Sequence, residues 1–130
     1  MILAYLAGPF TADTPWGIER NIREAESAAA FIITHRSDVS LVVPHMMGRN
    51  FVGRAGTAEY WYDATMRMLE ACEALVLLPG WQGSNGSRAE FRRAHELGLK
   101  IYAAPEDLAF DGSPMDAALI ELCGDTLESP

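Results

Sequence analysis

The sequence predicts a three-layer, doubly wound α/β domain, and two observations lead to this fold class. Short apolar runs of strand length alternate along the chain with segments whose apolar residues recur at helical spacing. This alternation is typical of mostly parallel strands that are joined by right-handed helical crossovers. The length of 130 residues, of which 49% are hydrophobic, suits one domain with a buried core. Residues 1–130 are therefore expected to form a single domain.

The first half of the chain carries two predicted strands and a long helix. Residues 2–7 form an apolar run that Gly8-Pro9 ends. Thr14-Pro15 is a good helix start, because threonine can cap the first turn and proline is favoured at the first helical position. The helix is expected to run to about Thr34, and residues 39–43 form the second strand.

The second half begins with a glycine-rich stretch over residues 45–56, whose length indicates a functional loop rather than a simple connector. Thr57 can cap a helix that reaches about Cys72. The remaining predicted elements are a strand over 74–78, a helix that follows Ser87 and stops at Gly98, a strand over 99–103 and a last helix over 114–123.

Four or five mostly parallel strands in this order make a flavodoxin-like sheet. Ligands of open α/β sheets bind outside the carboxyl ends of the strands. The loops after the first three strands, which contain Gly8-Pro9-Phe10, Pro44-His45 and residues 80–86, therefore lie on one edge. We expect a pocket there, while its chemistry must come from the residues themselves.

Charge and composition restrict the class of partner. The net charge is −8 and the ten basic residues are scattered, which argues against binding to nucleic-acid polymers. No segment approaches the roughly twenty apolar residues that cross a bilayer. Two cysteines, Cys72 and Cys123, are too few for a disulfide scaffold and lack zinc-site spacing. We expect a cytoplasmic protein that binds a small molecule, with no membrane contact and no metal or other cofactor.

Glu90 is the first candidate for chemistry. It follows a Gly/Ser-rich loop near the start of a helix, where backbone N–H groups and the helix dipole favour an ionised carboxylate. A carboxylate held charged at a pocket is a candidate nucleophile. Alternatively, Ser87-x-x-Glu90 fits a capping box, in which the two residues satisfy each other's backbone donors. The glycine spacing matches neither the dinucleotide fingerprint nor the Walker loop. These residues alone leave both roles open.

Three motifs point to a known family. Tyr5-Leu6-Ala7-Gly8-Pro9-Phe10 ends the first strand, Leu78-Pro79-Gly80-Trp81 ends the third, and Ser84-x-Gly86-x-x-x-Glu90 opens the next helix. In this order they resemble the nucleoside 2-deoxyribosyltransferase superfamily, nearest to its small members and its nucleotide N-glycosidase branch. The resemblance implies cleavage or transfer at the N-glycosidic bond of a nucleoside or a nucleoside 5′-monophosphate. It implies that Glu90 forms a covalent glycosyl-enzyme, assisted by a hydrogen bond from Tyr5.

The same resemblance suggests roles around the pocket. Gly8 would let the backbone approach the ligand, and Phe10 and Trp81 could stack on a base, although isolated aromatic residues more often serve packing. His45 could contact base or phosphate, or could simply be solvated at the rim. Ser84, a serine where relatives that hydrolyse monophosphates carry one, could donate to a phosphate at the helix start or could be an ordinary turn residue. The predicted substrate-binding residues are Gly8, Pro9, Phe10, His45, Trp81, Ser84, Gly86 and Ser87.

One position departs from the family pattern. Members carry an Asp eight residues ahead of the acid that begins the third strand, and here the acid is Glu73 while Thr65 takes the earlier place. Asp63 is the remaining candidate for the acid that handles the leaving base. It lies two residues earlier, about 200° away on an ideal helix. If the acid is missing, the domain could be a non-catalytic nucleotide-binding or sensing module.

The resemblance also implies a homodimer or a larger homo-oligomer in which a neighbouring copy completes each pocket. Trp61-Tyr62 would supply aromatic surface of the kind that is found at such interfaces.

Overall fold

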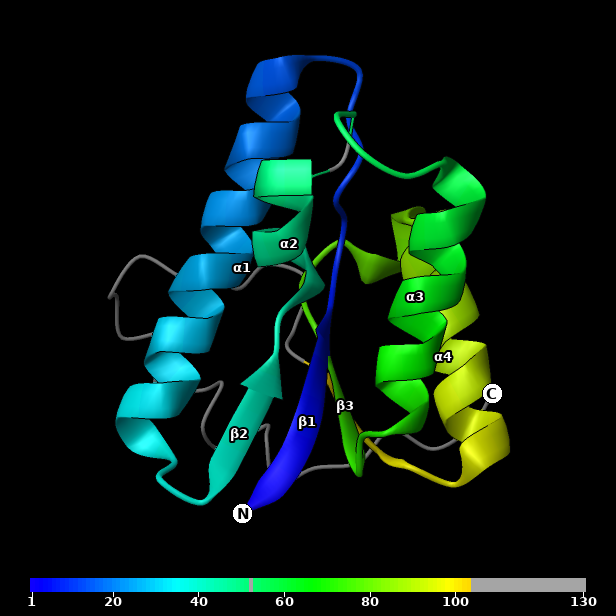
Figure 1. Ribbon diagram of the computed structural model, residues 1–130. Coiled ribbons are helices and arrows are strands. Elements are labelled where there is room, and N and C mark those ends of the chain that lie inside the picture. Colours follow the sequence, from blue (N-terminus) through cyan, green and yellow to red (C-terminus); the bar gives the residue numbers. More distant parts are fainter. Residues whose placement is uncertain (52, 104–130) are drawn as a thin grey trace.

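The sheet consists of four parallel strands in the order β2-β1-β3-β4 (Figure 1). A computed structural model describes residues 1–51 and 53–103, and the side chain of Ala103 is outside this description. The predicted helix over 114–123, Cys123 and any fifth strand lie outside the described residues. The strands are β1 (Ile2–Ala7), β2 (Val39–Val42), β3 (Ala74–Leu77) and β4 (Lys100–Ala103).

Helices connect the strands as the pattern predicted, with one addition. The structure adds α2 where the sequence indicated only a loop. The helices are α1 (Pro15–His35), α2 (Pro44–Phe51), α3 (Ala58–Glu70) and α4 (Asn85–Leu97), with a short 3₁₀ helix, η1 (Trp81–Gly83).

The sheet is covered on both faces, so the three-layer doubly wound fold is confirmed. Successive side chains of a strand point to opposite faces. Ala4 and Leu6 of β1 therefore belong to the core beneath α1, whereas Tyr5 and Ala7 belong to the core beneath α3 and α4. Figure 1 shows α1 on one side of the strands and α3 and α4 on the other. The strand order is the flavodoxin-like order, whose ligand-binding switch point lies between β1 and β3.

Two predicted helix starts are confirmed. The Thr14 hydroxyl accepts a hydrogen bond from the Gly17 N–H at 3.0 Å, and Pro15 is the first residue of α1. The Thr57 hydroxyl accepts from the Tyr60 N–H at 3.0 Å and caps α3. Each cap satisfies one of the donors that a helix start leaves unpaired.

The prediction of a loop over residues 45–56 is wrong for its first half, which forms α2. Two tertiary contacts stabilise this short helix. Gly48 packs against Phe10 so closely that a Cβ atom there would lie 2.5 Å from the ring. Arg49 forms ion pairs with Glu19 at 2.6 Å and Glu26 at 2.7 Å on α1. Local glycine content suggested a loop, while contacts with distant residues favour the helix.

Candidate active site

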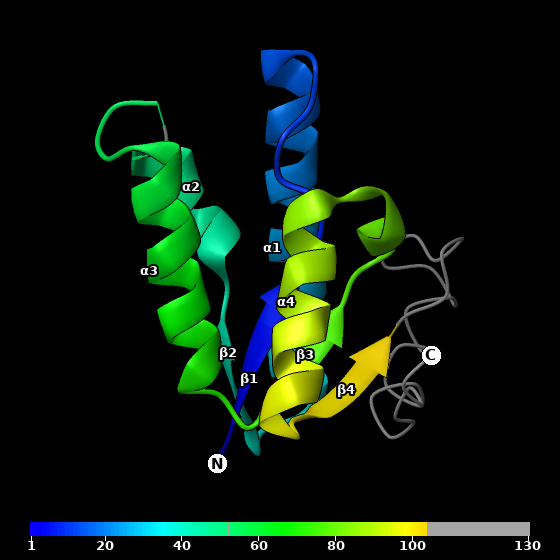
Figure 2. The same cartoon turned by 90° about the vertical axis from the view of Figure 1, so that its right-hand side faces the viewer.

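A cavity of about 570 Å³ lies at the carboxyl edge of the sheet, between β1, α2, α3 and the start of α4. This volume is within the range of small-molecule sites. Figure 2 shows α3 and α4 on the same side of the sheet, with η1 between β3 and α4. Among the predicted site residues, those that line the cavity are Tyr5, Gly8, Phe10, His45, Ser84, Gly86, Ser87 and Glu90.

Glu90 lies in the second turn of α4, and its alternative role in a capping box is wrong. The helix begins at Asn85 with Ser84 as its N-cap, and the Ser84 hydroxyl accepts from the Ser87 N–H at 3.2 Å. Glu90 is therefore six residues past the cap and too far along α4 to pair with it. Its half-buried side chain lines the cavity instead.

The expectation that the helix start keeps Glu90 fully ionised is also wrong. Burial raises the pKa of the Glu90 carboxyl to about 7, and an interaction with the Tyr5 hydroxyl opposes that rise. Loss of hydration disfavours the charged carboxylate more than the helix dipole can favour it from the second turn. Near neutral pH the group therefore exchanges between its acid and its carboxylate.

Tyr5 is fully buried on β1, and its hydroxyl makes no close hydrogen bond among the described residues, although it lies near enough to the Glu90 carboxyl to affect its pKa. The pKa of the Tyr5 phenol is raised, first by burial and then by the charge of the nearby Glu90. The phenol thus stays protonated and can donate a hydrogen bond to a carboxylate or to a sugar oxygen.

Thr65, which replaces the acid of the family pattern, lines the cavity on α3. Its hydroxyl donates to the Trp61 carbonyl oxygen at 2.9 Å. Asp63 is exposed on α3 and is not among the residues that line the cavity. The position eight residues before Glu73 therefore faces the site, as the family pattern implies, but the residue there is a threonine and not an acid.

His45 is 5% exposed, so the picture of a solvated rim histidine is wrong. Its Nε2 lies 3.0 Å from the Pro9 carbonyl oxygen, to which it donates when the proton is on Nε2. Burial lowers the pKa of the imidazole and favours this neutral form. Nδ1 then carries a lone pair, and it has no partner within the described residues.

The start of α4 offers further unpaired groups. Ser87 is 1% exposed, and its hydroxyl has no hydrogen-bond partner among the described residues. Beside it, Gly86 leaves open space: apart from its chain neighbours and the backbone of its own helix, the nearest atom to where a Cβ would stand is the Ser84 hydroxyl oxygen at 4.0 Å. Tyr5, His45 and Ser87 are the three residues whose buried side-chain atoms lack partners in the described chain, and all three line this cavity. Buried polar groups are almost always hydrogen-bonded, so this arrangement indicates a polar ligand.

Three predicted binding residues have a structural explanation instead. Trp81 packs against Phe91 with ring centroids 5.1 Å apart and does not line the cavity. Pro9 contributes the carbonyl that holds His45. Gly8 lines the cavity, but a Cβ there would lie 2.9 Å from Leu78, so close packing at the turn requires glycine.

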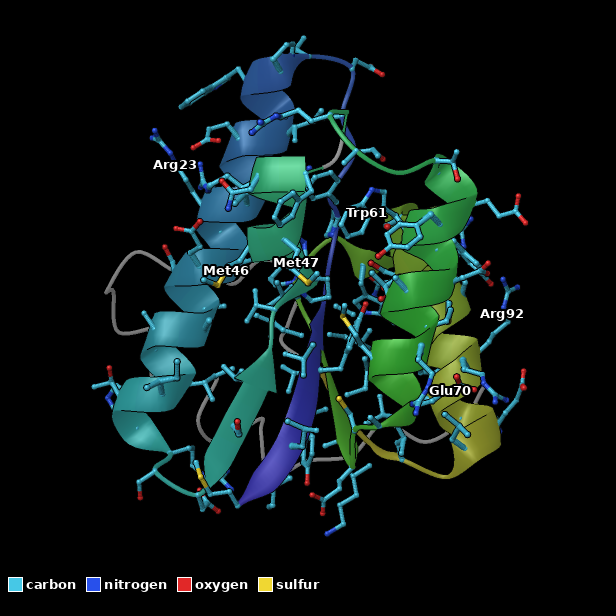
Figure 3. All side chains as sticks on the ribbon, in the orientation of Figure 1. Arg23, Met46, Met47, Trp61, Glu70 and Arg92 are labelled. Carbon is cyan, nitrogen blue, oxygen red and sulfur yellow. The ribbon has the colours of Figure 1, made fainter. Side chains whose placement is uncertain are left out.

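The aromatic wall of the cavity comes from α3, which the sequence analysis did not assign to binding. Trp61 and Tyr62 line the cavity together with Phe10. The Trp61 indole N–H donates to the Ala55 carbonyl oxygen at 2.8 Å, which fixes the ring. Figure 3 shows Trp61 extending from α3 toward α2, where it stacks on Phe51. The signal was the spacing of residues 58, 61, 62, 65 and 66, which lie on one helical face.

The described residues contain neither a candidate metal site nor a helix that could span a membrane. Within residues 1–51 and 53–103, no group of three or more His, Cys, Asp or Glu side chains is arranged to hold a metal ion. In the same part of the chain, no helix has the length and apolar character needed to cross a bilayer.

Solved structures show the same fold. A 2-deoxyribosyltransferase from the psychrotolerant bacterium Bacillus psychrosaccharolyticus matches with a TM-score of 0.57 and 14% identity, over 78% of this chain and 70% of that one. A 2-deoxyribosyltransferase from Leishmania mexicana matches with a TM-score of 0.53 and 20% identity, over 81% of this chain and 66% of that one. The predicted resemblance is therefore confirmed at the level of the fold.

Of two sequence comparisons, one finds no match and the other finds a family. No curated protein matches the sequence. Residues 2–103, however, match the model of the family described as "Domain of unknown function (DUF4406)". That match covers most of the chain, and the protein belongs to this family.

Proposed function

We propose that this protein cleaves or transfers at the N-glycosidic bond of a nucleoside or a nucleoside 5′-monophosphate, with Glu90 as nucleophile. The observation that carries the proposal is the cavity in which Glu90 meets three unpaired polar atoms, those of Tyr5, His45 and Ser87. The shared fold supports it, because two solved structures with this fold are 2-deoxyribosyltransferases.

The reaction would follow the retaining-glycosidase scheme. The ionised Glu90 attacks C1′ of the sugar while the bond from C1′ to the base breaks, which gives a glycosyl ester. Tyr5, whose protonated hydroxyl lies near Glu90, would donate to the carboxylate or to the sugar. Water or a second base then attacks C1′ and frees Glu90. Water as the acceptor makes the protein a hydrolase, and a base as the acceptor makes it a transferase.

The start of α4 supports a 5′-phosphate on the substrate. Ser84 uses its hydroxyl oxygen as an acceptor for the Ser87 N–H, so the Ser84 proton is free to be donated. The Ser87 hydroxyl and the open space at Gly86 adjoin it. Unpaired N–H groups and the dipole of a helix start favour an anion. Arg88 is not among the residues that line the cavity, and its guanidinium donates to the Gln82 carbonyl oxygen at 2.7 Å.

A second candidate function is a non-catalytic nucleotide-binding module with the same cavity. Thr65 favours it, because a threonine stands where the family pattern has an acid. Both candidate functions predict that the cavity binds a nucleoside or nucleotide, but only the enzyme would release the base.

Other properties stay predictions: a single domain over residues 1–130, a cytoplasmic location and a homo-oligomer. Exposed aromatic side chains, Phe51, Tyr60 and Tyr62, lie on α2 and α3 beside the cavity and could contact a second copy. Light scattering of the purified protein at micromolar concentration should give at least the mass of a dimer. A monomeric mass in a preparation that turns over substrate would contradict the oligomer.

The test of function is release of free base from a panel of nucleosides and their monophosphates. We expect release that the Glu90→Gln variant loses and that the matched variant Glu24→Gln, on the exposed surface of α1, retains. Ligand-induced thermal stabilisation without any base release would favour the binding module. For the phosphate, a deoxynucleoside and its 5′-monophosphate are compared, and an equal or faster rate on the unphosphorylated compound would contradict the phosphate seat.

A further inference from the structure

Among the described residues, the lining of the cavity includes a candidate attacking group, Glu90, but no second carboxyl that could act as a proton donor. The ionisable side chains among its described lining residues are Tyr5, His45, Tyr62 and Glu90, with no Asp, Lys or Arg. Thr65 stands in the facing position on α3, and its hydroxyl proton is already donated to the Trp61 carbonyl oxygen. Departure of a neutral purine or pyrimidine from a sugar is assisted by protonation of the base, which calls for a general acid.

Neither His45 nor Tyr5 is well placed to protonate a leaving base, and Tyr62 offers only a weakly acidic phenol. His45 uses Nε2–H for the Pro9 carbonyl oxygen, and its remaining nitrogen is an acceptor. Tyr5 is a buried phenol close to Glu90, on the side of the attacking carboxylate. A leaving group that already carries a positive charge needs no such donor.

The walls of the cavity suit a flat cation. Phe10, Trp61 and Tyr62 present aromatic surface, and a cation over an aromatic face is attracted by the ring quadrupole. The Trp61 ring is held in place by its hydrogen bond to the Ala55 carbonyl oxygen. Glu90 is the acidic lining residue among the described ones, and the whole chain carries a net charge of −8.

We propose that the preferred substrates are N-glycosides of a cationic heteroaromatic base, such as a pyridinium or an N-alkylated purinium. This inference rests on the proposed function of Glu90. The Glu90 oxygen forms a bond to C1′ as the bond from C1′ to the ring nitrogen breaks. The electron pair of the broken bond stays on that nitrogen, which cancels the positive charge, so the base leaves neutral and takes no proton. Water then attacks C1′, Glu90 leaves as carboxylate, and one proton passes to the solvent.

A cationic substrate also activates the nucleophile. A positive charge close to a carboxyl favours its ionised form, so binding of the cation lowers the pKa of Glu90 from its raised value. Substrate binding thereby generates the attacking carboxylate at neutral pH.

The experiment compares base release from N-ribosylnicotinamide, a pyridinium nucleoside, with release from inosine, each rate divided by the uncatalysed rate. Because general acids contribute about 10²- to 10⁴-fold, we expect the corrected rate for the cation to be at least about tenfold higher. Thr65→Asp places an acid in the facing position, and it should reduce this preference by about tenfold or more by accelerating inosine cleavage. Thr65→Val, the matched variant without an acid, should leave the preference unchanged.

Binding gives a readout that does not depend on turnover. The protein should bind 1-methylnicotinamide more tightly than uncharged nicotinamide, and Glu90→Gln should reduce that difference. A corrected rate for inosine that equals or exceeds the rate for N-ribosylnicotinamide would overturn this inference but not the proposed function. Equal binding of 1-methylnicotinamide and nicotinamide would have the same consequence. Absence of base release from every substrate would contradict the proposed function, and the inference would fall with it.

Discussion

The two faces of the sheet differ in what their packing leaves unpaired. Beneath α1 the core is built from Ala, Leu, Ile and Val side chains. On the opposite face, the same strands place Tyr5 next to a cavity that also contains the unpaired atoms of His45 and Ser87. Neighbouring residues of β1 thus have different roles, because the Leu6 side chain packs in the α1 core and the Tyr5 side chain lies on the face that carries the site. The α1 face thus provides stability, while the α3/α4 face leaves polar groups without partners that a ligand can bind.

The largest expected effect is on turnover and comes from the α3/α4 face. Glu90→Gln should reduce base release by about 10³-fold or more, because a nucleophile acts in every productive event. The melting temperature should be maintained or raised, since the substitution removes a buried ionisable group. Thermal unfolding and base release are measured on the same samples, with Glu24→Gln as control. Substantial activity in Glu90→Gln would remove Glu90 from the mechanism.

The second prediction separates the two faces by stability. Ile32→Ala, on α1, deletes a side chain that is 3% exposed in the α1 core and should lower the free energy of unfolding by about 2–5 kcal/mol. Tyr5→Phe removes only a hydroxyl without a partner and should change it by less than about 1 kcal/mol. Activity should respond in the opposite order, with about a tenfold loss in Tyr5→Phe, because a hydrogen bond to a charged group is worth about 1.5–3 kcal/mol. Denaturant unfolding and steady-state rates test both. Equal activity losses in the two variants would remove the distinction between the faces.

The third prediction concerns pH. The attacking carboxylate must be ionised, so kcat/KM should rise with pH, with a midpoint near the Glu90 pKa of about 7, and level off above it. The Tyr5 hydroxyl lowers the pKa of Glu90, so Tyr5→Phe should move this midpoint to higher pH. The stability of the fold should change with pH in the opposite direction to kcat/KM. The folded pKa lies above the unfolded value of about 4.3, so the folded state holds the proton more tightly and stability falls as pH rises from about 4 to 7. A midpoint that does not move in Tyr5→Phe would contradict the coupling between the two groups.

The smallest expected effects lie at the start of α4. Ser84→Ala removes the helix cap and should cost about 1 kcal/mol of stability. Ser87→Ala removes an unpaired hydroxyl and should leave stability nearly unchanged. Both variants should weaken the binding of a 5′-monophosphate more than the binding of the matching nucleoside, and the KM values of the two substrates measure this. If binding of the two substrates were weakened equally, the phosphate would not bind at the start of α4.

The strands and the fold class could be predicted because apolar patterning and turn residues are local signals. The Thr14 and Thr57 caps were predictable for the same reason. The start of α4 was set three residues late, since Ser84 and Ser87 can both cap a helix and only the structure shows which one does.

The properties that define the site depend on contacts between distant residues. His45 is buried as part of α2, and α2 packs through Gly48 on Phe10 and pairs through Arg49 with Glu19 and Glu26 on α1. Likewise, the raised pKa of Glu90 comes from burial that no stretch of sequence around it encodes. The choice between Trp61 and Trp81 was beyond the sequence, because both follow reasonable patterns and only one faces the cavity.

The central claim is that Glu90 becomes covalently bound to the sugar. The most direct measurement is peptide mass spectrometry after acid quenching of the protein during turnover of a substrate that it cleaves. We predict a mass increase equal to the glycosyl group on the peptide that contains Glu90, and no such increase in Glu90→Gln. Turnover without any adduct, or an adduct on another residue, would contradict the account.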